Sequence, residues 1–469
     1  MLLKIILGLI TLSVFSFIPA TAQTTNAAGK QEILDPEMMI GRWSGPLKVN
    51  DAVSLTLALN IFYDDKQSIS ATLDSVDQNA FGITVDPFSI TDTMISGRVP
   101  SIGASFEFEI TNGSLVGTFT QGIDLPLILE RRDEAEAPKQ KPQEAALVRD
   151  YIIEEVSFSG GADGVVLAGE LTKPKGEGPF PAVVLITGSG PQDRDEALLG
   201  HKPFLILSDH LTNQGFAVLR YDDRGVGAST GDFATATTFD FADDAAAALT
   251  FLTTRSDIDP TRLGYIGHSE GGLVAPLAHK QKAANYAILL ASPTEGFADT
   301  IIRQTSDILR INGETEDVIE ARRIEQLESF EILSGKDSLE SKESNLRSFL
   351  SETGLDSDEI DRQVLAAINP WFIEALDYNP IPDLEAMNIP VFGVFAETDL
   401  QVSAAVNAPT MEAALRHPKS KVVTLEGLNH LFQPSETGAP SEYATLDVTF
   451  DPSALLTVST WVKNITQPD

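Results

Sequence analysis

The pentapeptide G-x-S-x-G at residues 267–271 follows an apolar run typical of a buried strand and precedes small residues typical of a helix start. This context predicts a sharp turn from strand to helix with Ser269 at its apex. Gly267 and Gly271 leave room where a Cβ would collide with neighbouring backbone. The N–H of Glu270 would begin the helix and point at a developing oxyanion. A serine held in this way has the exposure that a nucleophile needs.

A serine nucleophile needs a base, and imidazole has a pKa suited to moving protons near neutrality. His430 follows the last predicted strand, at residues 421–425, and fits the chain order serine, acid, histidine. The acid is expected just past the strand at residues 390–395. We favour Asp399 there over Glu397, although an aspartate that only caps the helix from Ser403 would have the same pattern.

The other five of the six histidines fit the role of base less well. His201, His210 and His279 precede any plausible acid, and His417 lies in a solvated stretch. His268 is part of the turn itself, where its side chain would point away. A second oxyanion donor is expected from the loop after the strand at residues 180–186, and we favour the N–H of Ser189, with Gly190 as the alternative.

Two further segments contain charged or aromatic side chains that could belong to a functional site. Residues 222–229, with two aspartates, an arginine and turn glycines, are interpreted mainly as a structural tie between loops. Trp371 and Phe372 are a candidate wall for an acyl group, or alternatively part of a helix core. Residues 297–385 interrupt the alternation of strands and helices with charged helices, expected at residues 301–311, 318–333 and 360–375, and are interpreted as a lid.

The chain divides by pattern into two folded parts. Residues 36–131 alternate in hydrophobicity like half-buried strands, with a hairpin predicted at Asn112-Gly113, and indicate an all-β barrel or sandwich. Residues 132–147 are charged and contain proline, as linkers do. From residue 148 to 469, strands alternate with helices, which is typical of an α/β protein with a mostly parallel sheet. The β domain is interpreted as a structural accessory or, alternatively, as a binding module.

Residues 1–22 have the pattern of a secretory signal, with Lys4, an apolar stretch and a small-x-small site ending at Ala22. We expect export to a periplasm or to the outside of the cell, a mature chain starting near Gln23, and no membrane insertion after cleavage. The sequence has no cysteine, which excludes disulfides, and a net charge of −35, which argues against binding nucleic acid or an anionic membrane surface. The loop Gly188-x-Gly190 has Asp193 at the position where a dinucleotide-binding motif needs its third glycine, which argues against dinucleotide binding.

Several motifs together resemble bacterial α/β-hydrolases, some of which have an N-terminal β domain and a lid. The resemblance lies in residues 188–195, 200–204, 221–227, 267–272, 399–402 and 429–433. It implies the α/β-hydrolase fold, no metal or organic cofactor, and hydrolysis of carboxylic esters of small acyl molecules. The chain is also similar to serine aminopeptidases. One departure is Thr187, where many relatives have histidine.

The sequence therefore supports three hypotheses. The first is a serine hydrolase that cleaves esters through Ser269, His430 and Asp399, with the N–H groups of Glu270 and Ser189 as oxyanion donors. The second is a peptidase that anchors a free amino terminus on lid carboxylates. The third is a binding protein whose function lies in the β domain, which an intact set of catalytic residues argues against.

Overall fold

The computed structural model describes residues 36–49, 54–64, 67–78, 80–91, 94–99, 103–121, 123–132, 140–355 and 357–466. The predicted signal segment, residues 1–22, lies outside them. The chain forms two compact units, the first made almost wholly of residues before Gln140 and the second of those from Gln140 on. Over the described residues, no helix combines the length and the apolar character needed to cross a membrane.

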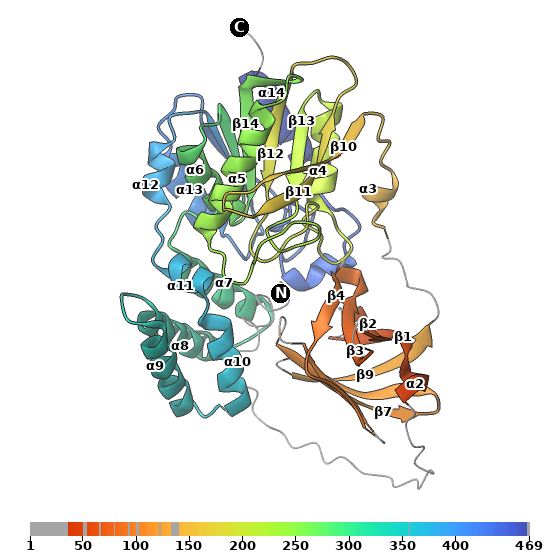
Figure 1. Cartoon of the computed structure of the whole chain (residues 1–469). Helices are drawn as coiled ribbons and strands as arrows, with labels where there is room; N and C mark the ends of the chain where they lie inside the picture. Colours follow the sequence, from red (N-terminus) through yellow and green to blue (C-terminus); the bar gives the residue numbers. More distant parts are fainter. Residues whose placement is uncertain are drawn as a thin grey trace. The chain divides into compact units, whose positions relative to one another are not determined.

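The first unit is a nine-stranded antiparallel sheet, drawn in red to orange in Figure 1. Its elements are α2 (Pro36–Met39), β1 (Gly41–Lys48), β2 (Ser54–Tyr63), β3 (Ile69–Ser75), the short η1 (Val76–Gln78), β4 (Ala80–Val85), β5 (Phe88–Ile90), β6 (Ile95–Val99), β7 (Ala104–Thr111), β8 (Ser114–Gln121) and β9 (Ile123–Arg132). The order is β4-β3-β2-β1-β9-β8-β7-β6-β5, so the first strand pairs with the last. This is the order of an up-and-down barrel rather than of a two-sheet sandwich.

Alternation of side chains explains the core of this unit. Leu57, Leu59 and Ile61 on β2 are buried, as their spacing predicts, together with Phe106 and Phe108 on β7. The predicted hairpin is present: Thr111 pairs with Ser114, and Asn112 and Gly113 between them have φ angles of 52° and 81°. Both values are those of the tight hairpin turn that Asn-Gly favours.

The second unit is built on an eight-stranded sheet. Its strands are β10 (Ile152–Ser159), β11 (Val166–Lys173), β12 (Phe180–Ile186), β13 (Ala217–Tyr221), β14 (Ile258–His268), β15 (Tyr286–Leu290), β16 (Val391–Ala396) and β17 (Lys421–Leu425). The order is β10-β11-β13-β12-β14-β15-β16-β17, antiparallel over the first three strands and parallel from β13 onward. Counted within the unit, this is 1-2-4-3-5-6-7-8, so the crossover strands lie in the middle of the sheet.

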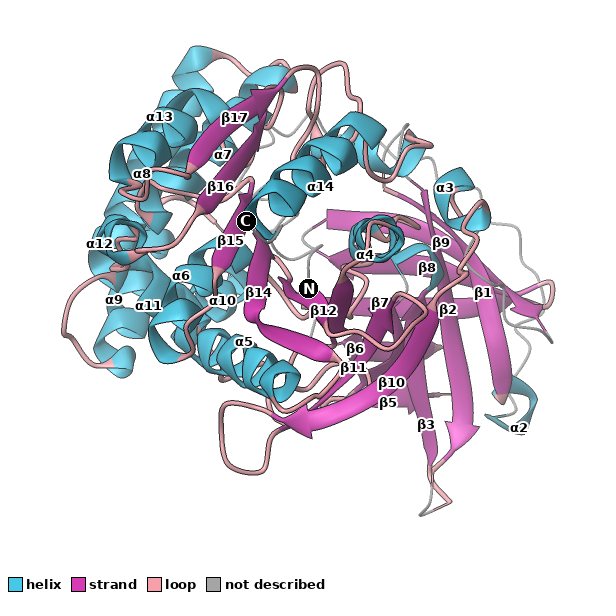
Figure 2. Cartoon of the chain, turned by 90° about the horizontal axis from the view of Figure 1, so that it is seen from above, coloured by secondary structure: helices cyan, strands magenta, loops and turns pink. Residues whose placement is uncertain are grey.

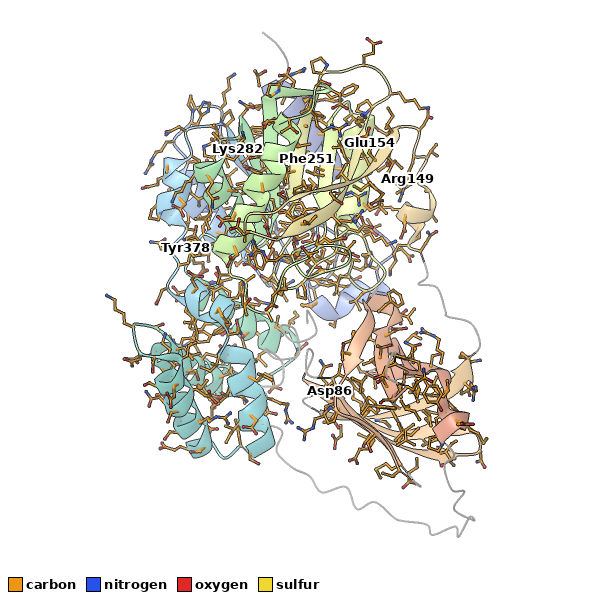
Figure 3. The ribbon with its side chains drawn as sticks, viewed as in Figure 1. Asp86, Arg149, Glu154, Phe251, Lys282 and Tyr378 are labelled. Atoms are coloured by element: carbon orange, nitrogen blue, oxygen red, sulfur yellow. The ribbon has the colours of Figure 1, made fainter. Side chains whose placement is uncertain are left out.

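Helices cover both faces of this sheet (Figure 2). One face packs against α4 (Pro203–Asn213) and α14 (Pro452–Thr466), and the other against α5 (Thr238–Thr253), α6 (Gly271–Gln281) and α13 (Ala404–Ala414). Phe251, labelled in Figure 3, stacks on Phe158 of β10 with ring centroids 5.1 Å apart. Because both faces are covered, the central strands β12, β15 and β16 consist of apolar residues, as the sequence indicates.

Part of the segment expected to be a linker is folded onto the second unit. A short helix, α3 (Pro142–Ala145), has its proline in the first turn, where the missing N–H needs no partner. The Gln143 side chain accepts from the N–H of Thr449 at 2.6 Å and donates to the carbonyl of Phe450 at 2.8 Å. These contacts account for ordered structure in a charged segment that has no apolar periodicity.

The insertion between β15 and β16 is helical, as expected, but its helices differ in number and length. They are α7 (Phe297–Ile311), α8 (Glu316–Leu333), α9 (Leu339–Glu352), α10 (Ser357–Ala367), α11 (Pro370–Leu376) and α12 (Ile381–Ala386). In Figure 1, α8, α9 and α10 lie together, with α7 and α11 nearer the sheet. The expectation of one helix over residues 360–375 was wrong: Asn369 caps the N–H of Phe372 at 2.8 Å, and Pro370 starts a new helix. The helix α9 was not predicted.

Candidate active site

Ser269 lies at the sharp turn between β14 and α6. Its φ angle is 53°, in the left-handed region that is strained for a residue other than glycine, and its side chain is partly exposed. The N–H of Ser269 donates to the carbonyl of Leu290 at 2.9 Å and so holds the turn against β15. The flanking glycines are required: a Cβ on Gly267 would lie 2.0 Å from the carbonyl oxygen of Gly271.

His430 and Asp399 are brought together by the loops after β17 and β16. His430 Nδ1 lies 2.8 Å from Asp399 Oδ2, and the Asp399 side chain is fully buried. The other oxygen, Oδ1, accepts from the N–H groups of Gln401 at 2.7 Å and Val402 at 2.9 Å. Because a carboxylate only accepts, Nδ1 carries the proton, and Nε2 of a neutral His430 is left as the base.

The alternatives to these residues have other partners. Glu397 is exposed and accepts from the N–H of Gly427 at 3.0 Å, which ties the two loops together. His201 is buried against Thr449 Oγ1 and the carbonyl of Tyr443, and burial lowers its pKa to about 4. His417 is exposed.

The loop after β12 lies beside the serine. A Cβ on Gly188 would lie 3.2 Å from Ser269 Cβ. The loop is therefore packed against the turn at residues 268–270, which we call the elbow. Thr187 donates from its hydroxyl to Asp223 at 3.0 Å, and Gln192 donates to the carbonyl of Ser189 at 3.2 Å. The loop that contains the predicted donor Ser189 is therefore held from both sides.

Glu270 has a role for its side chain as well as for its backbone. It is the residue before α6, where backbone N–H groups point out of the helix. Its buried carboxylate accepts from Thr238 Oγ1 at 2.6 Å, from Trp371 Nε1 at 2.7 Å and from the Ser189 hydroxyl. Burial raises the pKa of the Glu270 carboxyl above its usual range. The carboxylate thus connects the turn at Ser269 to both the loop after β12 and the helix α11.

The two candidate wall residues lie on α11. Trp371 reaches the elbow through Glu270, and its ring contacts Phe297 edge to face with centroids 5.3 Å apart. Phe372 packs against Phe297 and Phe330 at centroid distances of 5.5 and 5.7 Å. The structure therefore brings Trp371 close to Ser269 through Glu270 and places Phe372 in an aromatic cluster that joins α7, α8 and α11.

The segment at residues 222–229 makes structural contacts, as interpreted from the sequence. Asp222 binds the Arg194 guanidinium at two positions, 3.0 and 2.9 Å, and Arg224 binds Asp244 at 2.7 Å. Asp223 is buried against Thr187, and burial raises the pKa of its carboxyl well above the usual range. These side chains hold the neighbouring loops and the start of α5.

A small pocket is lined by the loop after β12 and by acidic side chains. Thr187, Gly188 and Glu270 form part of its wall, and Asp223 and Asp244 contribute further carboxylates. Over the residues that the structure describes, no three His, Asp or Glu side chains are arranged so that they could hold a metal ion.

Sequence reasoning missed one buried acid near the serine. Glu196 is 5% exposed, and its Oε1 accepts from the N–H of Gly188 at 2.7 Å and contacts His268 Nδ1 at 2.9 Å. No spacing rule connects Glu196 with His268, which lies on another element. The sequence gives one indication that Glu196 is buried, since it directly precedes the apolar residues Ala197-Leu198-Leu199. A buried acid in such a stretch needs a partner for its charge.

Known proteins are similar to different parts of this chain. Residues 204–328 match a family model described as serine aminopeptidase, S33. Esterase EstD of Thermotoga maritima is 27% identical over 341 residues, covering 72% of this chain and 76% of the relative. The structure of the Pyrococcus furiosus esterase Pf2001 aligns with a TM-score of 0.43 and 14% identity, over 71% of this chain and 97% of that one. Est1E of Butyrivibrio proteoclasticus, solved with ferulic acid, aligns with a TM-score of 0.39 and 18% identity, over 66% and 96%.

Three observations bear on the family. The central sheet has the order 1-2-4-3-5-6-7-8, its fifth strand ends in a serine at a strained turn, and residues 204–328 match a hydrolase family model. Together they show that the second unit has the α/β-hydrolase fold and that residues 204–328 are similar to a family of hydrolases.

Proposed function

We propose that this hydrolase is a carboxylesterase that forms an acyl-enzyme on Ser269. The observation that carries the proposal is the 2.8 Å contact between His430 Nδ1 and the fully buried Asp399 carboxylate. His268 is the residue before Ser269, and its ring centroid lies 4.8 Å from that of His430. This proximity supports a role for His430 and Asp399 at Ser269. The similarity to esterase EstD supports an ester as the bond that is cleaved.

The proposed reaction follows from the protonation states. His430 Nε2 takes the proton of the Ser269 hydroxyl as its oxygen attacks the ester carbonyl carbon. Asp399 accepts from Nδ1 and stabilises the imidazolium that forms. His430 then gives the proton to the leaving alcohol, and a water molecule, deprotonated in the same way, releases the acid from Ser269.

The oxyanion of each tetrahedral intermediate is proposed to bind the N–H groups of Glu270 and Ser189. The first lies at the start of α6, where the helix dipole favours negative charge. The second lies on the loop that packs against Ser269 through Gly188. Trp371 is proposed as the wall for the acyl group, because its ring is partly buried and anchored at Glu270.

Fluorophosphonate labelling read by intact mass tests the nucleophile. The wild type should gain one adduct, and Ser269→Ala should gain none and lose turnover of p-nitrophenyl esters by a factor on the order of a million. Ser292→Ala is the matched control, because this serine follows the neighbouring strand β15 and its buried hydroxyl has no partner among the described residues. That variant should label like the wild type. Labelling that persists in Ser269→Ala would refute the assignment.

A serine aminopeptidase is the second candidate, favoured by the description of the matching family model. Such an enzyme needs carboxylates to bind the substrate's free amino group. The acids around the elbow already accept hydrogen bonds from the protein: Glu270 from Trp371, and Asp223 from Thr187. This supports the esterase, and a comparison of p-nitrophenyl acyl esters with aminoacyl anilides separates the two. Turnover of the anilides at a rate equal to or above that of the esters would favour the peptidase.

A further inference from the structure

The buried carboxylate of Glu196 is in an unusual position for an acid. Glu196 has a φ angle of 53°, in the left-handed region, and only 5% of its surface is exposed. One oxygen, Oε1, makes two contacts, with the Gly188 N–H at 2.7 Å and with His268 Nδ1 at 2.9 Å. The other oxygen, Oε2, is buried without a partner among the described residues. A strained, desolvated carboxylate of this kind is costly unless a charge compensates it.

The contacts of His268 determine where its protons are. Its Nε2 lies 2.9 Å from the carbonyl oxygen of His430, which can only accept, so Nε2 is protonated. Its Nδ1 faces Glu196 Oε1, which also accepts the N–H of Gly188. Because a carboxylate oxygen can only accept, the contact with Glu196 requires a proton on Nδ1 as well. With protons on both ring nitrogens, His268 is an imidazolium paired with Glu196.

The electrostatic surroundings agree with a charged ring. Burial by itself would lower the pKa of His268, but the Glu196 carboxylate, the carbonyl of His430 and the charge of Asp399 raise it above the ordinary value. The ring of His430 lies against the same imidazole, and Phe432 covers another side without adding charge.

We propose that Glu196 and His268 form an ion pair that positions the catalytic groups, an inference that rests on the proposed function. The pair holds three separate parts of the site: the loop with the Ser189 donor through Gly188, the elbow through the bond from His268 to Ser269, and the His430 loop through its carbonyl. The three contacting atoms of the pair, Glu196 Oε1 and the two ring nitrogens of His268, form no hydrogen bond with Ser269 Oγ or His430 Nε2, so both are positioning residues. The ion pair fixes the distance between the oxyanion donors and the base.

Glu196→Gln is the sharpest perturbation, because it keeps the shape and removes the charge. In the structure a single carboxylate oxygen, Oε1, contacts both the Gly188 N–H and His268 Nδ1. The glutamine amide has no charge to keep His268 protonated at Nδ1, so its oxygen and its NH₂ group can each satisfy only one of these two partners. If the amide oxygen keeps its hydrogen bond with the Gly188 N–H, His268 becomes neutral and has no proton on Nδ1. The hydrogen bond between His268 and residue 196 is then lost. If the amide turns its NH₂ to Nδ1, the contact with Gly188 is lost. Either outcome frees one part of the site.

Asp257→Asn is the matched control. Asp257 directly precedes the other end of β14 and forms ion pairs with Arg255 at 2.8 Å and with Lys173, so the variant also removes one charge from a partly buried cluster next to the same strand. We expect it to lower stability without changing turnover per folded molecule.

The experiment measures turnover, KM and ¹⁵N-histidine NMR spectra of the full-length protein. In the wild type both ring nitrogens of His268 should be protonated at neutral pH, and in Glu196→Gln Nδ1 should become unprotonated. The same variant should lose kcat by about 10- to 100-fold, somewhat less than the loss of a direct oxyanion donor, while KM stays near the wild-type value. Spectra of single histidine variants assign the signals.

Several results would overturn the proposal. One is a neutral His268 in the wild type, and another is wild-type kcat in Glu196→Gln. A loss of kcat that Asp257→Asn reproduces would reduce the pair to a general contribution to stability. If the wild type neither labels nor turns over esters, the proposed function fails. The His430 ring signals then still decide the present inference, because they should shift in Glu196→Gln and unchanged signals would refute it.

Discussion

Replacing Gly271 by alanine should damage both the fold and the catalytic site. A Cβ on Gly271 would lie 2.2 Å from the carbonyl oxygen of Ile186 and 2.7 Å from that of Thr187, whereas ordinary contacts are 3.4–4 Å. Both obstructing atoms belong to the main chain, at the end of β12 and the start of the loop that follows it. A flexible side chain could move aside, but here the loop and the elbow must separate by about 1 Å.

The size of both effects follows from this displacement. Overpacking of a rigid site costs about 1–3 kcal/mol in free energy of unfolding, and the upper end is expected because no side chain can adjust. A displacement of about 1 Å in a positioned catalytic group costs on the order of 100-fold in rate. The loop that would move contains Ser189, the proposed oxyanion donor.

Urea titration and the second-order rate of fluorophosphonate labelling measure the two effects on one protein. Gly296→Ala is the control, since a Cβ there meets nothing within 4 Å and the backbone φ of −59° suits any residue. It should cost less than about 1 kcal/mol, chiefly from the altered start of α7. Wild-type stability together with a wild-type labelling rate in Gly271→Ala would refute the reasoning.

Three further predictions follow from other parts of the chain. Trp371→Phe keeps an aromatic ring but removes the donor to the buried Glu270 carboxylate, worth about 1.5–3 kcal/mol, so limited proteolysis of the lid should be at least about tenfold faster; an unchanged cleavage rate would contradict this attachment. His201 is fully buried, with a pKa lowered to about 4 against an ordinary value of about 6.5, so between these values the unfolded chain binds a proton that the native protein does not. The free energy of unfolding should therefore fall by on the order of 3 kcal/mol as the pH drops through this window, and urea titrations should find a smaller fall in His201→Gln; an equal fall would assign the effect to other groups. For the N-terminal segment we propose export and cleavage after Ala22, so the intact mass of the exported protein should correspond to a start at Gln23, and a retained N-terminus would count against the signal.

The strands of the second unit could be predicted closely from the sequence. β12 and β17 have the predicted bounds, residues 180–186 and 421–425, because each is a short run of mostly apolar, β-branched residues bounded by polar or turn residues. The contact between Asp399 and His430 was also predictable, since both residues follow strands of one parallel sheet and their loops emerge at the same edge.

The lid and Glu196 were harder to predict for different reasons. In α9 only Lys342, Leu346 and Leu350 are buried, so its apolar pattern is too sparse to identify. The break before α11 was visible as Asn369-Pro370, but the charged helical pattern on both sides hid it. The partners of Glu196 lie on other elements, and one of them is a backbone N–H, which has no signature in the sequence.

The position of the lid in the chain has a consequence for the order of folding. About 100 residues separate β15 from β16, which pair in parallel, so a long loop must close before this pairing forms. The serine strand lies on one side of that closure, and the strands that lead to Asp399 and His430 lie on the other. Refolding should therefore restore the central strands and the elbow before it restores a reactive serine, and labelling by a fluorophosphonate would report a late step.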